Sequence, residues 1–201
     1  MTERVDIANL ALSWLGEQDI TSLEDDTNRS HQMKINYIPA RDATLEAHEW
    51  SFAIERFIPA KLAANPVYGI NSAFSVPPEI LRVLTVERNT ADPTNSFLTG
   101  RIGGNEQLDW VLEGGLILCN QDVIYCRGIR RVEQEGKFSP LFVHALAAKL
   151  AFLTATNLSA SAAIQENMLQ LYVGFIHEAK SRDGLQGRSR RLRDRTLMKS
   201  R

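Results

Sequence analysis

The chain has 201 residues, of which 44% are hydrophobic and 23% are charged, and it contains only two cysteines. These proportions match an average folded domain, so they exclude a disordered chain, a collagen-like fibre and a disulfide-stabilised scaffold. Because the sequence contains no run of eighteen apolar residues and no basic-then-apolar leader, we expect neither a membrane span nor a secretory signal.

The net charge of −1 conceals an uneven distribution along the chain. Residues 180–201 contain nine Lys or Arg against two Asp, a balance of +7, whereas residues 1–179 have a balance of −8. This division predicts an acidic folded body that carries a basic arm. Because apolar residues become rare after Gly184, residues 183–201 are predicted to form an extended, solvated C-terminal arm.

The N-terminal segment predicts a helix followed by an acidic turn. Apolar residues recur at helical spacing from Ile7 to Leu15, and Gly16 follows at the position of a C-terminal cap. The acidic run at residues 24–26 lacks the alternating ligand spacing of a calcium loop. We interpret it as a solvated turn favoured by the N-terminus of the next helix, with a hard-cation site as the alternative.

A second helix is predicted from Thr27 or Asn28, either of which can cap it, to about His48. Pro39 falls within this helix and is expected to bend it or split it. The side expected to face the core comprises Met33, Tyr37, Ala40, Thr44 and Ala47.

Residues 51–137 are rich in proline and glycine, and short β-prone runs lie between these breakers. Gly114 and Gly115 predict a tight hairpin turn, since glycine accepts the positive φ angles that such a turn requires. We therefore interpret this stretch as a small, mostly antiparallel β-domain. Its predicted strands are Ile80–Val86, Leu108–Leu112, Leu116–Cys119 and Val123–Ile129.

Two further helices are predicted near the C-terminus. Ser139 and Pro140 indicate the start of the third helix, which has apolar residues nearly all round and should be central in the core. After a break at residues 157–161, a fourth helix runs to about Arg182. Its predicted apolar stripe comprises Ile164, Met168, Leu171 and Phe175.

This order of elements predicts an α+β fold with a four-helix core that is interrupted by a small antiparallel β-domain. The helical core is expected to comprise residues 1–50 and 138–182, and the β-rich insertion domain residues 51–137. The extended basic arm, residues 183–201, would follow the core.

Signatures of catalysis and of cofactor binding are absent from the sequence. No phosphate-binding loop, dinucleotide-binding glycine motif or nucleophile elbow occurs, so we expect a protein that is not an enzyme and has no cofactor or metal. Cys119 and Cys126 are interpreted as buried thiols rather than zinc ligands, because they lack the close spacing of structural zinc sites. A sugar hydrolase would need two carboxylates across a cleft. The candidate pairs are Glu46 with Glu49, and Asp122 with Glu133.

The basic arm admits three interpretations. It could neutralise the phosphates of a nucleic acid, dock into an acidic groove of a protein partner, or remain a disordered solubilising end. Apolar residues such as Leu192 and Leu197 among the charges favour a protein groove, and the lack of aromatic residues argues against base stacking. The arm residues that would make the contact are Arg188, Arg190, Arg191, Arg193, Arg195, Leu197 and Arg201, and the three interpretations stay open on these residues alone.

Four stretches that follow one another along the chain carry a family resemblance. The segment Ala40–Ala53 is similar to an Arg-Asp…His-Pro-Trp-Asn-Phe-Ala element, and Phe138–Ala151 is similar to a Phe-x-Pro-x-Phe-x-x-Ala-Leu-Ala-x-x-Leu-Ala element. Together with residues 6–26 and Val76–Val83, these segments resemble the tail tubular protein A family, the head-to-tail adaptors of short-tailed bacteriophages.

The resemblance implies a structural virion protein at the head-tail junction, made in the host cytoplasm. It implies a ring of twelve copies between the portal protein and the tail nozzle protein, with DNA passing through the lumen without sequence-specific binding. The family's arm reaches into the portal, which assigns a portal-docking role to the basic arm here. The first and last pairs of helices would supply the contacts between neighbouring copies. A nucleic-acid-binding protein that uses the basic arm is the alternative.

Overall fold

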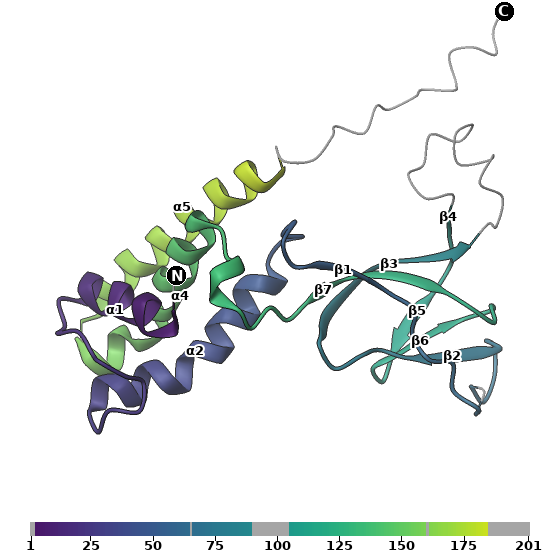
Figure 1. The fold of residues 1–201 in the computed structure, drawn as a ribbon, viewed down its shortest axis with the longest axis horizontal. Helices are drawn as coiled ribbons and strands as arrows, with labels where there is room; N and C mark the ends of the chain where they lie inside the picture. Colours follow the sequence, from purple (N-terminus) through teal and green to yellow (C-terminus); the bar gives the residue numbers. More distant parts are fainter. Residues whose placement is uncertain (1–2, 65, 90–104, 160, 185–201) are drawn as a thin grey trace, which may run out of the picture.

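The computed structural model describes residues 3–64, 66–89, 105–159 and 161–184. Figure 1 shows the helices gathered in one part of the molecule and the strands in another, connected where α2 leads into β1 and where β7 leads back to the helices. The fold is therefore α+β, with helices before and after the strands, as the sequence predicts.

The helical part is organised around one central helix. The helix α4 packs against each of the other three, and nine of its residues are buried. By length and composition α4 is also the one helix in the described part of the chain that could cross a membrane, but half of that stretch is buried inside the protein, as is common for a core helix. The helices are α1 (Arg4–Leu15), α2 (Asn28–Glu46), α4 (Pro140–Leu158) and α5 (Ala162–Gly184).

The predicted helix ends are confirmed by their capping contacts. Gly16 takes a left-handed conformation, with φ of 74°, after α1. Thr27, one of the two predicted caps of α2, accepts a hydrogen bond from the backbone N–H of Ser30 at 3.2 Å. Ser139 accepts one from the N–H of Phe142 at 3.3 Å, so α4 begins at the predicted position.

Pro39 does not split α2, which is one helix from Asn28 to Glu46. A proline at this position removes only the hydrogen bond to the carbonyl of Ile35. Because Ile35 and Pro39 are both exposed, water can satisfy that carbonyl. The predicted inner side of α2 is confirmed, since Met33, Tyr37, Ala40 and Thr44 are buried and Ala47 packs against the core.

The helix α5 differs from its prediction in two respects. It continues through Asp183 and Gly184, so these two residues are helical and do not belong to an extended arm. Leu171, expected in the apolar stripe, is 40% exposed, because α5 packs mainly against α4 and its buried face is correspondingly narrow. Its buried residues are Met168, Ile176 and Ala179.

The strands form two antiparallel sheets. One sheet has the order β1-β7-β3-β4 and the other the order β2-β6-β5. A small hydrophobic cluster that includes Phe74, Val86 and Ile117 joins residues of both sheets. The strands are β1 (Ile54–Phe57), β2 (Ser72–Ser75), β3 (Ile80–Asn89), β4 (Asn105–Gln107), β5 (Val111–Glu113), β6 (Leu116–Cys119) and β7 (Tyr125–Arg130).

The predicted hairpin is confirmed. Gly114 and Gly115 have φ angles of 57° and 78°, and they connect β5 to β6 through the closing pair Glu113 and Leu116. The prediction of a strand over residues 108–112 is wrong for its first three residues, which connect β4 to β5. Leu108 and Trp110 in this connection pack against the hydrophobic cluster.

Candidate functional site

The predicted docking residues of the arm lie outside the described residues. This applies to Arg188, Arg190, Arg191, Arg193, Arg195, Leu197 and Arg201. The structure does describe the root of the arm, which is the last turn of α5 next to the segment between α2 and β1.

Asp183 anchors the root of the arm. Its carboxylate accepts hydrogen bonds from the hydroxyl of Ser51 at 2.7 Å and from the backbone N–H of Ser51 at 3.0 Å. The Nε2 atom of His48 lies 3.6 Å from the same carboxylate. Since the Asp183 side chain is only 11% exposed, these contacts hold the end of α5 against the start of the β-domain.

His48 is a titratable group of this contact, and its pKa is shifted. Burial lowers the pKa of His48, and the nearby carboxylate of Asp183 opposes that shift only in part. The imidazole also packs edge-on against Trp50, with ring centroids 4.9 Å apart. His48 is therefore mainly neutral near pH 7, and its contact with Asp183 is more a polar contact than an ion pair.

Two of the segments that carry the family resemblance, Ala40–Ala53 and Phe138–Ala151, meet next to this anchor. Trp50 and Phe52 from the first segment pack against Phe142 from the second, with ring centroids 5.1 Å and 5.2 Å away, and Phe138 completes the cluster. The indole N–H of Trp50 donates to the carbonyl of Thr44 at 2.9 Å. These motif residues therefore build the junction between the helices and the sheets, and their role there is structural.

The Arg-Asp pair of the same motif forms a second contact across the junction. Arg41 is only 2% exposed, and its guanidinium lies 2.9 Å from one carboxylate oxygen of Asp42. The other oxygen of Asp42 accepts from Nε of Arg131, just after β7, also at 2.9 Å. Asp42 thus compensates a buried cation and ties the chain after β7 to α2.

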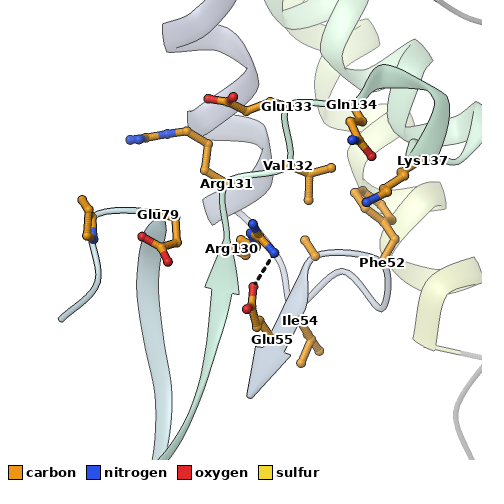
Figure 2. Close-up of a pocket in the computed structure, with 12 residues that line it drawn as sticks. Phe52, Ile54, Glu55, Glu79, Arg130, Arg131, Val132, Glu133, Gln134 and Lys137 are labelled. Atoms are coloured by element: carbon orange, nitrogen blue, oxygen red, sulfur yellow. Dashed lines mark ion pairs between the residues drawn. The ribbon is translucent and has the colours of Figure 1, made fainter. Parts of the chain in front are cut away.

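An open groove of about 690 Å³ lies at the same junction. Figure 2 shows the ion pair of Glu55 and Arg130 in this groove, with Lys137 and Phe52 on one side of it and Glu133 on the other. The charged nitrogen of Arg130 is 3.1 Å from the carboxylate of Glu55. Charges of both signs line the groove, which suits contact with a polar protein segment and offers no activated nucleophile.

The carboxylate pairs considered for sugar hydrolysis do not form a site. Asp122 precedes β7 and pairs with Lys61 at 2.7 Å, whereas Glu133 follows β7. A strand of this length spans roughly 20 Å, which is well beyond the roughly 5–10 Å between glycosidase carboxylates. Glu46 and Glu49 are both exposed, and neither lines the groove.

The acidic run before α2 makes contacts within its own chain. Asp25 accepts hydrogen bonds from the N–H of Ser22 at 3.0 Å and of Thr21 at 2.9 Å, and these bonds lower the pKa of Asp25. Glu24 forms an ion pair with Lys34. Within the described residues no group of three or more His, Cys, Asp or Glu is arranged to hold a metal ion. These contacts fit the interpretation of a solvated acidic turn.

The prediction of buried thiols is confirmed. Cys119 and Cys126 are free and buried, and burial raises the pKa of both thiols, for Cys126 to about 12. They lie on β6 and β7, which follow each other in the chain but belong to different sheets. Thiols with such pKa values are poor nucleophiles and poor metal ligands at neutral pH.

Neither a scan against protein-family models nor a search of curated proteins finds a match to this chain.

Sequence reasoning missed the contacts that organise the junction, namely Asp183 with Ser51 and Asp42 with Arg131. The Arg41-Asp42 motif pointed to one half of the second contact, but no local pattern indicated its partner.

Proposed function

We propose that the chain is a head-to-tail adaptor of a short-tailed bacteriophage. Copies of the chain form a ring, of twelve copies by the resemblance, between the portal protein and the tail nozzle protein. The basic C-terminal arm docks into the portal, and DNA passes through the lumen of the ring without base-specific contacts. The protein is a structural component of the virion and performs no catalysis.

The observation that carries this proposal is the meeting of the resembling segments. Residues 40–53 and 138–151 lie far apart in the sequence, yet their aromatic residues pack in one cluster. The matched positions of both segments thus contribute to the same aromatic cluster. This shared packing supports the interpretation that they belong to one ordered family pattern. The anchor at Asp183 lies beside this cluster and places the root of the arm at the same junction.

The charge distribution gives the proposal a physical basis. The body of residues 1–179 has a balance of −8, so it repels a DNA chain that has to slide past it. The arm has the opposite sign, and arginine forks pair well with carboxylates on a protein partner. The two tasks, DNA passage and portal attachment, are assigned to different parts of the chain.

The test is a binding assay between the portal and variants of the full-length protein. A chain truncated after Gly187 should lose portal binding while its circular dichroism spectrum and unfolding midpoint stay unchanged. The matched control replaces Arg56 and Arg88 of the body with Gln, which removes positive charge elsewhere and should leave portal binding intact. Unchanged portal binding by the truncated chain would contradict the docking role of the arm.

The same full-length and truncated chains distinguish this proposal from the alternative, a nucleic-acid-binding protein. If the arm served DNA, the full chain would bind duplex DNA with an affinity that falls steeply with salt, and truncation would abolish this binding. We expect the arm to bind the portal far more tightly than DNA at physiological salt. Tight DNA binding without portal binding would favour the alternative.

A further inference from the structure

The outer face of α2 exposes a small apolar patch. Ile35 is 54% exposed and Ile38 is 50% exposed, and Pro39 beside them is exposed as well. These residues lie on the side of the helix opposite to the buried Met33 and Tyr37. Clustered isoleucines on a helix surface are unfavourable in water and mark a candidate contact surface.

The outer face of α5 exposes a second apolar patch. Leu171 is 40% exposed and lies one turn before the exposed Gly174 on the same side of the helix, whereas Val173, 51% exposed, lies round the helix from Leu171. A Cβ atom built on Gly174 meets nothing within 4 Å, so packing within the chain does not require glycine there. Glycine is unfavourable in the middle of a helix. A close approach by another molecule at this position would explain why a glycine stands there.

The two patches belong to different faces of the helical part. Both helices pack against α4, and Figure 1 shows α5 and α2 on different sides of it, running in the same general direction. Two distinct patches on one chain can join copies head to tail, and such a heterologous contact closes into a ring when the rotation between copies permits it.

The two faces also match in spacing and in charge. On α2, Ile35 is followed by Ile38 three residues later and by the exposed Glu46 eight residues after that. On α5, the same spacing separates Leu171, Gly174 and the exposed Arg182. In parallel helices this register places isoleucine beside leucine, isoleucine over the glycine gap and a carboxylate beside a guanidinium.

We propose that the outer face of α2 in one copy packs against the outer face of α5 in the next copy of this chain. Ile38 of one copy lies over Gly174 of its neighbour, and Glu46 lies beside the neighbour's Arg182. This inference rests on the proposed function for the closure of the ring, but the contact itself requires only copies of this chain.

Cysteine cross-linking of the full-length protein tests the contact. The variants Ile35→Cys and Leu171→Cys, which the register places side by side and which leave Gly174 unchanged, are purified separately and treated with a short bismaleimide, alone and as a mixture. We expect covalent dimers only in the mixture, and a ladder of dimers, trimers and larger species in the double variant. The unmodified chain controls for Cys119 and Cys126, which are buried.

A matched control places the cysteine on an exposed apolar residue of the β-domain. Val123 and Ile35 are both 54% exposed, so Val123→Cys mixed with Leu171→Cys should give no dimers. Dimers from either single variant alone at the level of the mixture would overturn the proposal, because they would indicate a two-fold contact. The absence of a ladder from the double variant would overturn it as well.

Charge reversal gives an independent readout that needs no new cysteine. Glu46→Arg and Arg182→Glu should each weaken self-association in sedimentation by roughly fivefold, and the double variant should recover most of the loss. No recovery in the double variant would contradict the register. A ladder without portal binding would overturn only the proposed function, and portal binding without a ladder would overturn only this contact.

Discussion

Asp183 and Ser51 are 132 residues apart in the chain, yet the carboxylate of Asp183 accepts hydrogen bonds from both the hydroxyl and the backbone N–H of Ser51, at 2.7 Å and 3.0 Å. Asp183 belongs to the last turn of α5, and Ser51 lies just before β1. The pair therefore joins the root of the C-terminal arm to the entrance of the β-domain. Under the proposed function, a force on the arm reaches both parts of the fold through this contact.

Asp183→Ala should lower the free energy of unfolding by about 1–3 kcal/mol, because it removes charge-assisted hydrogen bonds and leaves the Ser51 N–H without its acceptor. The matched control is Glu178→Ala on the same helix, whose carboxylate forms an exposed ion pair with Arg182 at 3.9 Å. That control should change stability by less than about 0.5 kcal/mol. Urea unfolding measures both, and equal losses would argue against the anchor.

The stability of the protein should decrease as the pH falls below about 6.5, in part because of His48. Burial lowers the pKa of His48 in the folded chain, so between that pKa and the unfolded value the unfolded state binds more protons. The contribution of His48 is therefore complete above about pH 6.5 and is lost as the pH drops toward the folded pKa. His48→Gln should flatten this part of the profile, measured by urea unfolding at several pH values. An identical slope in the variant would exclude the role of His48.

Gly128→Ala should destabilise the larger sheet by about 1–3 kcal/mol. A Cβ atom at Gly128 would lie 2.9 Å from the carbonyl oxygen of Arg82 and from Cγ2 of Ile80, on the neighbouring strand β3. The control is Gly136→Ala, at a position where a Cβ atom meets nothing within 4 Å. Thermal unfolding should separate the two variants, and a neutral Gly128→Ala would show that the strands relax without cost.

Gly174→Ala should have opposite effects on folding and on assembly. Alanine is favoured over glycine within a helix by about 0.5–1 kcal/mol, and here it meets no neighbouring atom, so the dilute protein should become more stable. The added methyl group fills the gap proposed for Ile38 of the next copy, so self-association should weaken. Calorimetry of dilute protein and sedimentation at high concentration measure the two effects. Stabilisation with unchanged self-association would speak against the proposed contact.

The helices could be predicted well because their signals are local. Thr27, Ser139 and Gly16 each act on backbone groups within a few residues, so a short stretch of sequence contains the whole interaction. The hairpin at Gly114 and Gly115 is local in the same sense. Helical periodicity gave the inner side of α2 correctly, but it could not tell that α5 buries too narrow a face to cover Leu171.

The first two strands could not be predicted, since their own residues give little indication of a strand. Residues 54–57 contain two adjacent charged residues, and residues 72–75 contain two serines and no β-branched residue. The strand β1 exists because β7 pairs with it, and β2 because β6 does. The same holds for the contact of Asp42 with Arg131, which depends on the chain path over 89 residues.

The proposal of an adaptor is tested most directly by electron microscopy of the full-length protein mixed with its portal. We expect an additional ring of density on the tail-facing end of the portal, with the C-terminal arms extending into the portal wall. Portal particles that remain without an added ring, at protein concentrations where both components are folded, would contradict the proposed function.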